Sequence, residues 1–348
     1  MRNLKVIFLA IFLSFSANAN AKNIVILATG GTISGAGASS TGASYSPGKI
    51  DIDQVVKTIP GITKLAGIKA EQIMQVASQD MTSATWLEIS KKVNEMLAMR
   101  AVEGVVITHG TDTIEETAYF LNLTVKSKKP VVIVGSMRPG TSLSADGPLN
   151  LYNAVALASS NAAYNKGVLV MLNDEVFAAR DVAKTHTTNV SSFQSNNSGA
   201  MGFVHYGKPE IYYAPLRLHT YDTEFNIRKT TSLPKVDIVY AYAGSDSSVI
   251  DHFIEAGSKA IIIAGVGDGN IDKTSLEKLK AAAKKGLIVV RSAHLGSGAV
   301  ARNSEVNDDE FGFVTADNLS PQKARILTML ALTKTSNAEQ IQDMFARY

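Results

Sequence analysis

The chain has 348 residues and no cysteine, so disulfides, thiolate nucleophiles and cysteine-ligated metal sites are excluded. Its 34 basic side chains include Arg2 and Lys5 near the N-terminus, and without these two the remainder carries 32 basic against 31 acidic side chains. A balance this close to neutral, with no basic cluster interleaved with aromatic residues, predicts that the protein does not bind nucleic acid.

The N-terminus has the pattern of a cleaved export signal. A basic start is followed by the apolar run Val6 to Phe15 and then by small residues up to Ala21. The apolar run is about ten residues long, whereas a membrane-spanning helix needs roughly 20. We therefore expect residues 1–21 to be a signal peptide, with export, cleavage after Ala21 and no membrane attachment of the mature chain that starts at Lys22.

Apolar, β-branched runs recur along the chain and predict buried parallel strands. They are Ile24–Ala28, Val105–Thr108, Val131–Val134, Val168–Leu172, Val236–Ala241, Ala260–Ala264 and Leu287–Val290. Amphipathic stretches such as 85–99 and 275–285 lie between them and predict helices, which makes the chain an α/β protein. We expect a larger, doubly wound (flavodoxin-like) N-terminal domain over residues 22–212, a linker over 213–234, and a smaller, Rossmann-like α/β domain over 235–348.

The first predicted strand is followed by Thr29-Gly30-Gly31-Thr32. Paired glycines let the backbone turn tightly and approach a ligand, which would leave the Thr32 hydroxyl exposed for chemistry. A plain glycine turn is one alternative. A phosphate loop is another, but Ala43 stands where that loop needs its lysine. The following stretch, Ser34 to Gly48, is dominated by Gly, Ala and Ser, which is typical of a linker or a mobile lid.

The second predicted strand leads into His109-Gly110-Thr111-Asp112-Thr113. Thr113-Ile114-Glu115-Glu116 has the spacing of a capping box, so a helix should begin there and His109 to Asp112 should form a strand-to-helix turn. Ligands of open parallel sheets bind at such turns, which makes a nucleophilic hydroxyl beside the Asp112 carboxylate a candidate site. Thr113 as a simple helix cap and His109 as a structural histidine are the alternatives.

Lys184, in Arg180-Asp181-Val182-Ala183-Lys184, is a candidate base, because a lysine removed from water can accept a proton from a hydroxyl. Other chemistries lack their motifs. The six histidines include no His-Glu-x-x-His, and the chain has no Gly-x-Ser-x-Gly. The segment 265–269 lacks the third glycine of a dinucleotide fingerprint.

Taken together, the segments resemble the bacterial periplasmic L-asparaginases and the related glutaminase-asparaginases, from about Asn23 to Tyr348. The matching segments are 26–33 (ILATGGTI), 78–81 (SQDM), 107–113 (ITHGTDT), 137–139 (MRP), 144–148 (SADGP) and 321–325 (PQKAR). The resemblance implies a periplasmic amidohydrolase with a threonine nucleophile that needs neither a metal nor another cofactor.

Site residues follow from the same resemblance. It implies a nucleophilic Thr32 supported by Tyr45 on the Ser34–Gly48 lid and by Glu305 of a neighbouring subunit. A second group, Thr111, Asp112 and Lys184, would face the same substrate. Substrate binding is implied for Ser78, Gln79, Asp112 and Ser136, and for Asn270 of the partner chain. A site shared between chains implies a homo-oligomer, in this family a homotetramer built as a dimer of dimers.

The implied reaction converts L-asparagine to L-aspartate and ammonia, with conversion of L-glutamine to L-glutamate as a further candidate activity. Gln79 resembles the asparagine-preferring members, whereas Ser136, Asp268 and the runs 292–294 and 301–303 resemble the glutaminase-asparaginases. The two substrates differ by one methylene, which typically changes discrimination by only about 1–3 kcal/mol.

A periplasmic amino-acid binding protein is the alternative from another class. It would also be exported, nearly neutral and built from two α/β domains. Such a protein has no use for the joint presence of Thr32, Tyr45, Thr111, Asp112 and Lys184, so these residues favour the enzyme. Ammonia release on mixing with asparagine distinguishes the two.

Overall fold

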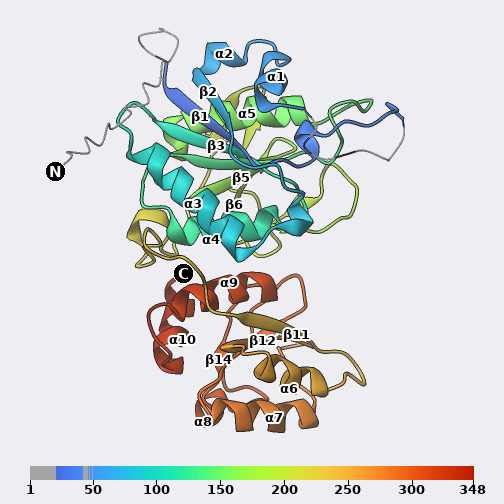
Figure 1. Ribbon diagram of the computed structural model, residues 1–348, viewed down its shortest axis with the longest axis vertical. Coiled ribbons are helices and arrows are strands. Elements are labelled where there is room, and N and C mark those ends of the chain that lie inside the picture. Colours follow the sequence, from blue (N-terminus) through green and yellow to red (C-terminus); the bar gives the residue numbers. More distant parts are fainter. Residues whose placement is uncertain (1–20, 42–45, 47, 49) are drawn as a thin grey trace, which may run out of the picture.

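A computed structural model describes residues 21–41, 46, 48 and 50–348 of the protein. Two β-sheets organise the chain, one in a larger N-terminal part and one in a smaller C-terminal part (Figure 1). The N-terminal sheet has eight strands in the order β10-β9-β6-β5-β4-β3-β1-β2. These are β1 (Asn23–Ala28), β2 (Gly67–Gln72), β3 (Gly104–Thr108), β4 (Val131–Val134), β5 (Val168–Leu172), β6 (Glu175–Ala178), β9 (Gly202–His205) and β10 (Lys208–Ile211).

Strands β2, β1, β3, β4 and β5 are parallel and lie in the 2-1-3-4-5 order of flavodoxin-like sheets. This confirms the predicted fold class. The three antiparallel strands β6, β9 and β10 at the other edge were not predicted. They begin with a tight hairpin in which Asn173 and Asp174 take left-handed φ values of 51° and 64°, a turn suited to two antiparallel strands.

Helices cover both faces of this sheet (Figure 1). One face packs against α1 (Ile52–Lys57), α2 (Ile62–Leu65) and α5 (Gly147–Ser159), and the other against α3 (Ser83–Ala98) and α4 (Ile114–Thr124). Alternate residues of one strand therefore enter different cores, with Val106 on the first side and Val105 and Ile107 on the second. Burial on both faces explains why the parallel strands are continuous apolar runs in the sequence.

The C-terminal sheet is parallel throughout, in the order β11-β12-β13-β14. Its strands are β11 (Val236–Tyr240), β12 (Ala260–Gly265), β13 (Ile288–Ala293) and β14 (Val314–Thr315). One face packs against α6 (Ser248–Glu255) and α7 (Lys273–Ala283), and the other against α9 (Pro321–Ala331) and α10 (Ala338–Arg347), while the short α8 (Asp308–Phe311) precedes β14. Two layers of helices around a parallel sheet match the predicted Rossmann-like arrangement.

The two parts share a hydrophobic core. One buried cluster combines side chains of both parts: it contains Trp86, Tyr119 and Phe120 from α3 and α4 together with apolar residues of β12, β13, α9 and α10. Phe225 and Ile227, from the segment proposed as a linker, are buried in that cluster as well. Burial of an aromatic or aliphatic side chain of this size stabilises a fold by roughly 1.5–3 kcal/mol. The linker is therefore packed, and the domain boundaries at residues 212 and 235 remain our proposal.

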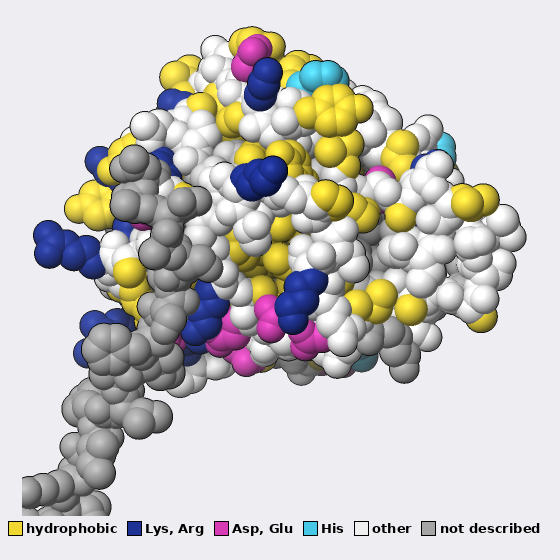
Figure 2. All heavy atoms as spheres, turned by 90° about the horizontal axis from the view of Figure 1, so that it is seen from above, with side chains coloured by type: hydrophobic (Ala, Val, Ile, Leu, Met, Phe, Trp, Pro, Cys, Tyr) yellow, Lys and Arg dark blue, Asp and Glu magenta, His cyan; other side chains and the backbone are white. Residues whose placement is uncertain are grey.

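The surface of the larger part is mixed in character. On the face shown in Figure 2, basic side chains are scattered among uncharged surface, and acidic ones lie mostly near the lower edge, with others at the top and on the right. No helix in the described part of the chain is both long and apolar enough to cross a bilayer.

Candidate active site

A cavity of about 700 Å³ opens at the carboxyl ends of β1 and β3. These two strands flank the point where the strand order reverses, which is where doubly wound sheets bind their ligands. Three short segments meet there, namely the 3₁₀ helix η1 (Thr32–Ser34) after β1, η2 (Ser78–Asp80) after β2, and the turn 109–113 after β3. The cavity is lined by Gly31, Thr32, Ser40, Thr41, Ser78, Gln79, Gly110, Thr111, Asp112, Met137, Arg138, Pro139, Ser142, Leu143, Ser144, Lys184, Thr187 and Thr188.

Glycines allow the three segments to approach one another. Gly31 has a left-handed φ of 87°, and a Cβ there would lie 2.5 Å from the backbone nitrogen of Gly110. A Cβ on Gly110 would in turn lie 2.6 Å from the Ser78 hydroxyl. Any larger residue must push these turns apart. Gly31 and Gly110 therefore allow Thr32 and Thr111, each 6% exposed, to line the same cavity.

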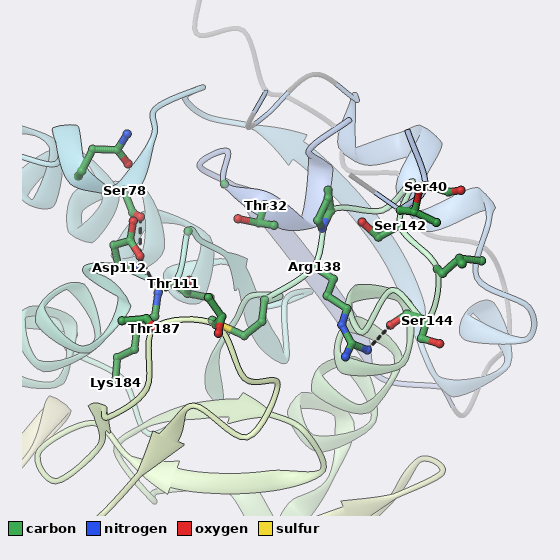
Figure 3. A pocket seen from close by; sticks show the side chains of 18 residues that line it. Thr32, Ser40, Ser78, Thr111, Asp112, Arg138, Ser142, Ser144, Lys184 and Thr187 are labelled. Carbon is green, nitrogen blue, oxygen red and sulfur yellow. Dashed lines mark hydrogen bonds and ion pairs between the residues drawn. The ribbon is translucent and has the colours of Figure 1, made fainter. Parts of the chain in front are cut away.

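Lys184 connects the second group of predicted residues. Its Nζ donates to the Thr111 hydroxyl at 3.0 Å and to the Asp112 carboxylate at 2.6 Å. Figure 3 shows this cluster on one side of the cavity, with Thr32 across from it. The Lys184 side chain is 17% exposed, whereas Asp112 is 59% exposed and available to a ligand. The arrangement links a hydroxyl, an ammonium and a carboxylate in one chain of hydrogen bonds.

Buried groups outside the cavity hold Lys184 in place. Lys184 lies on the short strand β7 (Ala183–Lys184), which pairs with β8 (Phe193–Gln194), and its backbone N–H donates to Glu115 Oε2 at 3.0 Å. Gln322 of α9 donates to the other Glu115 oxygen at 2.5 Å. Lys323 donates to the carbonyls of Arg180 and Val182, just ahead of β7. Burial lowers the pKa of Lys323 to about 8, although the negative charge of Glu115 acts to raise it.

The predicted substrate-binding residues are placed unequally. Ser78, Gln79 and Asp112 all line the cavity, and the Ser78 hydroxyl accepts the Asp112 backbone N–H at 3.2 Å. Ser136 is fully buried behind the lining, where its hydroxyl donates to the Arg138 carbonyl at 2.9 Å. A role of Ser136 near the amide would therefore require that hydroxyl to turn.

Two further predicted residues, Asn270 and Glu305, do not line this cavity. Asn270 and Glu305 lie on loops of the C-terminal sheet and are not among the described residues that line it. Tyr45 falls outside the described residues, as do residues 1–20 of the predicted signal peptide over 1–21. The described parts of the predicted lid contact the loop after β4, with the Gly37 N–H donating to Thr141 at 2.9 Å and the Leu143 N–H to the Ser40 carbonyl at 2.9 Å.

The predicted capping box at Thr113 is wrong. The helix does begin after Thr113, but that residue makes no side-chain capping bond. Its hydroxyl instead donates to the Ser78 carbonyl at 2.7 Å, and Glu116 is largely buried, which raises its pKa to about 6. Tertiary contacts between the two turns outweighed the local capping pattern.

His109 is a structural residue behind the turn. Its ring is fully buried, with Nδ1 2.7 Å from the Gly110 carbonyl and Nε2 2.9 Å from the Thr117 hydroxyl. Nδ1–H therefore donates to the carbonyl, and Nε2 accepts from Thr117. Burial lowers the pKa of His109 to about 4, despite the favourable bond to Gly110.

Because of His109, the folded protein should become less stable as the pH is lowered. Its pKa is lower in the folded chain than in the unfolded chain, so the unfolded chain binds the proton first as pH drops from about 6.5 to about 4. Over that window this residue should remove about 3 kcal/mol from the free energy of unfolding. Urea unfolding at fixed protein concentration checks this, with His109→Gln as the comparison. The stability advantage of the wild type should shrink by that amount between pH 7 and pH 4, and a constant difference would contradict the assignment.

Sequence reasoning gave no role to several residues of the site. The cavity is also lined by Ser142, Thr187 and Thr188, which lie in no matching segment, and by Arg138 and Ser144, which belong to the matching segments 137–139 and 144–148. Arg138 donates to the Ser144 carbonyl at 2.9 Å. Outside the cavity, Lys184 and the residues ahead of it are held by Glu115, Gln322 and Lys323. Gln322 and Lys323 belong to the matching segment 321–325, but the sequence did not indicate this role. Only the fold brings α9, more than 200 positions later in the chain, to the turn after β3.

Two protein-family models match the chain. The model described as Asparaginase, N-terminal matches residues 23–217, and the model described as Glutaminase/Asparaginase C-terminal domain matches residues 235–345. Together they span the fold and the cavity described above.

Individual relatives match over nearly their whole length. The chain is 48% identical over 332 residues to the probable periplasmic L-asparaginase of Haemophilus influenzae, covering 95% of each. It is 50% identical over 333 residues to the glutaminase-asparaginase of Acinetobacter glutaminasificans, covering 94% of this chain and 99% of that protein. A solved structure, the probable cytoplasmic L-asparaginase from Campylobacter jejuni, matches with a TM-score of 0.91 at 48% identity, covering 94% of this chain and all of that one.

Proposed function

This chain belongs to the asparaginase family, and from that premise we propose that it hydrolyses the side-chain amide of L-asparagine to L-aspartate and ammonia. L-Glutamine, with one more methylene, is the second substrate, in keeping with the names of its relatives. The observation that carries the proposal is the contact of Lys184 Nζ with both Thr111 and Asp112 in the cavity that Thr32 also lines. This placement puts two hydroxyls and proton-transfer groups around one ligand.

In the proposed reaction the Thr32 hydroxyl attacks the amide carbon. The C–N bond of the resulting tetrahedral intermediate breaks, the nitrogen takes up a proton and leaves as ammonia, and the acyl group remains as an ester on Thr32. Water then attacks the ester carbon, releases aspartate and returns the proton to Thr32. Two pairs of groups are candidates for moving these protons, Lys184 with Asp112 and Tyr45 with Glu305 of a second subunit.

Substrate selection is assigned to the polar wall opposite Thr32. Ser78, Gln79 and Asp112 line it, and the exposed Asp112 carboxylate suits the α-ammonium group of an amino acid. Gln79 is neutral, so it can donate to the α-carboxylate without the repulsion that an acidic side chain would cause. One extra methylene in the substrate changes binding by only about 1–3 kcal/mol, which leaves room for glutamine.

We further propose a homotetramer, built as a dimer of dimers, in which a neighbouring subunit completes each site. The support is positional, because Asn270 and Glu305 lie on C-terminal loops away from the cavity of their own chain. The Asn270 side-chain oxygen is buried and finds no hydrogen-bond partner among the described residues. Such an atom costs about 1–3 kcal/mol unless something outside the chain pairs with it.

Export to the periplasm is proposed from the signal pattern of residues 1–21. One relative is named periplasmic and one solved relative cytoplasmic, so the N-terminal sequence of this chain is what supports export. N-terminal sequencing of the protein from a periplasmic extract should begin at Lys22. A chain that starts at Met1 and stays in the cytoplasm would contradict the proposal.

Ammonia release from L-asparagine and L-glutamine tests the function. We expect turnover of both, with kcat/KM for asparagine the larger. A gap within about tenfold, or ~1.4 kcal/mol, would make the protein a glutaminase-asparaginase, and a much larger gap an asparaginase. A folded oligomer that binds either amino acid without releasing ammonia would overturn the enzyme proposal in favour of a binding protein.

A further inference from the structure

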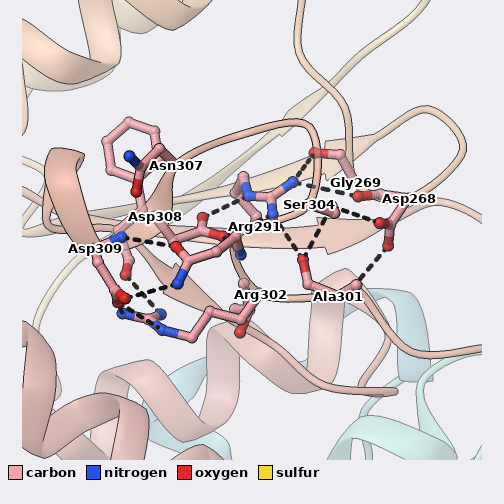
Figure 4. Close-up of polar contacts among 12 residues, drawn as sticks. Asp268, Gly269, Arg291, Ala301, Arg302, Ser304, Asn307, Asp308 and Asp309 are labelled. Carbon is pink, nitrogen blue, oxygen red and sulfur yellow. Dashed lines mark hydrogen bonds and ion pairs between the residues drawn. The ribbon is translucent and has the colours of Figure 1, made fainter.

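Two loops of the C-terminal sheet carry the residues proposed to complete a neighbouring site. The loop after β12, residues 266–272, holds Asn270, and the loop after β13, residues 294–307, holds Glu305. The sheet alone does not fix the distance between two separate loops at its edge. A network of polar side chains connects these two loops (Figure 4).

Arg291 of β13 is the centre of this network. Its side chain is fully buried, as is Asp308, and the two form a bidentate pair with N–O distances of 2.7 and 2.9 Å. Nη1 also donates to the carbonyls of Asp268 and Gly269 at 3.2 and 3.1 Å, and Nη2 to the Ala301 carbonyl at 3.0 Å. Every N–H of the guanidinium is thus used, and the last three bonds reach both loops.

Asp268 ties the two loops together directly. One carboxylate oxygen accepts the Ala301 backbone N–H at 2.8 Å, and the other accepts the Ser304 hydroxyl at 2.7 Å. These bonds keep the pKa of the Asp268 carboxyl below its usual range. Asp268 lies two residues before Asn270, and Ser304 lies directly before Glu305, so the tie spans the two residues of interest.

Burial of the Arg291–Asp308 ion pair carries an unfavourable desolvation free energy. Removing two charges from water is unfavourable, and apolar residues of the same size often stabilise a fold equally well. A geometric role explains why the chain keeps the pair. Asp308 Oδ2 also accepts the Asn303 N–H at 2.9 Å, so the second loop is held at Ala301, Asn303 and Ser304.

We infer that Arg291, Asp308 and Asp268 are positioning residues that set the spacing between Asn270 and Glu305 and thereby act on the active site of a neighbouring subunit rather than on their own. The inference rests on the proposed function and on the sharing of the site between subunits. It assigns a role in catalysis to groups that lie on a different sheet from the nucleophile.

Asp268→Asn tests the tie with little change in shape, because the amide cannot accept from both partners. We expect kcat/KM to fall about tenfold or more, since a misplacement of about 1 Å can cost on the order of 10²-fold. Asp246→Asn is the matched control. Asp246 also accepts one backbone N–H and one hydroxyl, both from Ser248, at the start of α6. It should leave activity within about twofold, and both variants should melt at similar temperatures.

Co-expression of two inactive variants tests action between subunits. In a mixed pair of Arg291→Met and Thr32→Ala chains, the first supplies an intact Thr32 and the second supplies intact loops, so one of the two sites is complete. Random assembly at equal amounts should restore about a quarter of wild-type activity. If Arg291→Met forms no soluble oligomer, the Asp268→Asn and Ser304→Ala double variant replaces it.

The outcomes separate the inference from the proposed function. No recovery in mixed oligomers would overturn the action between subunits, and full activity of Asp268→Asn would overturn the positioning role. With an active wild type, both outcomes leave the proposed hydrolysis standing. An inactive wild type would overturn the proposed function and, with it, this role.

Discussion

Replacement of Thr32 by alanine is expected to lower kcat/KM for L-asparagine by about 10⁴-fold or more, as loss of a nucleophile does in acyl-transfer enzymes. Thr32 lines the cavity at the end of β1 and is only 6% exposed. Its removal leaves the Lys184, Thr111 and Asp112 cluster without a hydroxyl across from it. Single-turnover and steady-state ammonia release measure the effect.

Thr32→Ser and Thr32→Val separate chemistry from packing. Serine keeps the hydroxyl and should retain a measurable part of the activity, whereas valine keeps the shape and should match alanine. All three should bind aspartate and melt near the wild type. Activity of Thr32→Val within about tenfold of the wild type would mean that another group is the nucleophile.

Replacement of Lys184 by methionine is expected to lower kcat by about 10²–10⁴-fold, the usual contribution of a positioned proton-transfer group. The ammonium contacts both the Thr111 hydroxyl and the Asp112 carboxylate, so its loss leaves both without their partner. The methionine side chain fills similar space, and the β7 backbone keeps its bond to Glu115. Steady-state ammonia release is again the measurement.

Two further variants sharpen the Lys184 result. Lys184→Arg keeps the charge but neither the geometry nor the ability to give up a proton, so it should remain impaired. Lys278→Met removes another lysine that is paired with a half-exposed aspartate, Asp251, and should leave activity unchanged. Full activity of Lys184→Arg would show that charge alone is needed and would remove Lys184 from proton transfer.

Most of the fold could be predicted because its strands are buried on both faces. Such strands are continuous apolar runs, and the 2-1-3-4-5 order then locates the site at the ends of β1 and β3. The antiparallel edge was missed because β9 and β10 are half exposed and include polar residues such as His205, Lys208 and Glu210. Their pairing depends on a hairpin turn and not on hydrophobic runs.

The site was predictable only where a motif marks it. Thr32 and Thr111 follow strands directly, and the structure brings both to one cavity as expected. Lys184 was named as a candidate base, but the groups that hold it could not be predicted, because β7 is only two residues long and Glu115 and α9 reach it through the fold. The Arg291 network was missed because its members are joined through space and form no motif in the sequence.

The identity of the acylated threonine tests the central claim most directly. Wild-type and Lys184→Met enzymes would be mixed with L-asparagine, quenched in acid during turnover and digested with trypsin, which places Thr32 in peptide 23–49 and Thr111 in peptide 101–126. We predict an aspartyl ester on Thr32. An ester on Thr111, with Thr32 unmodified, would contradict the assignment of the nucleophile.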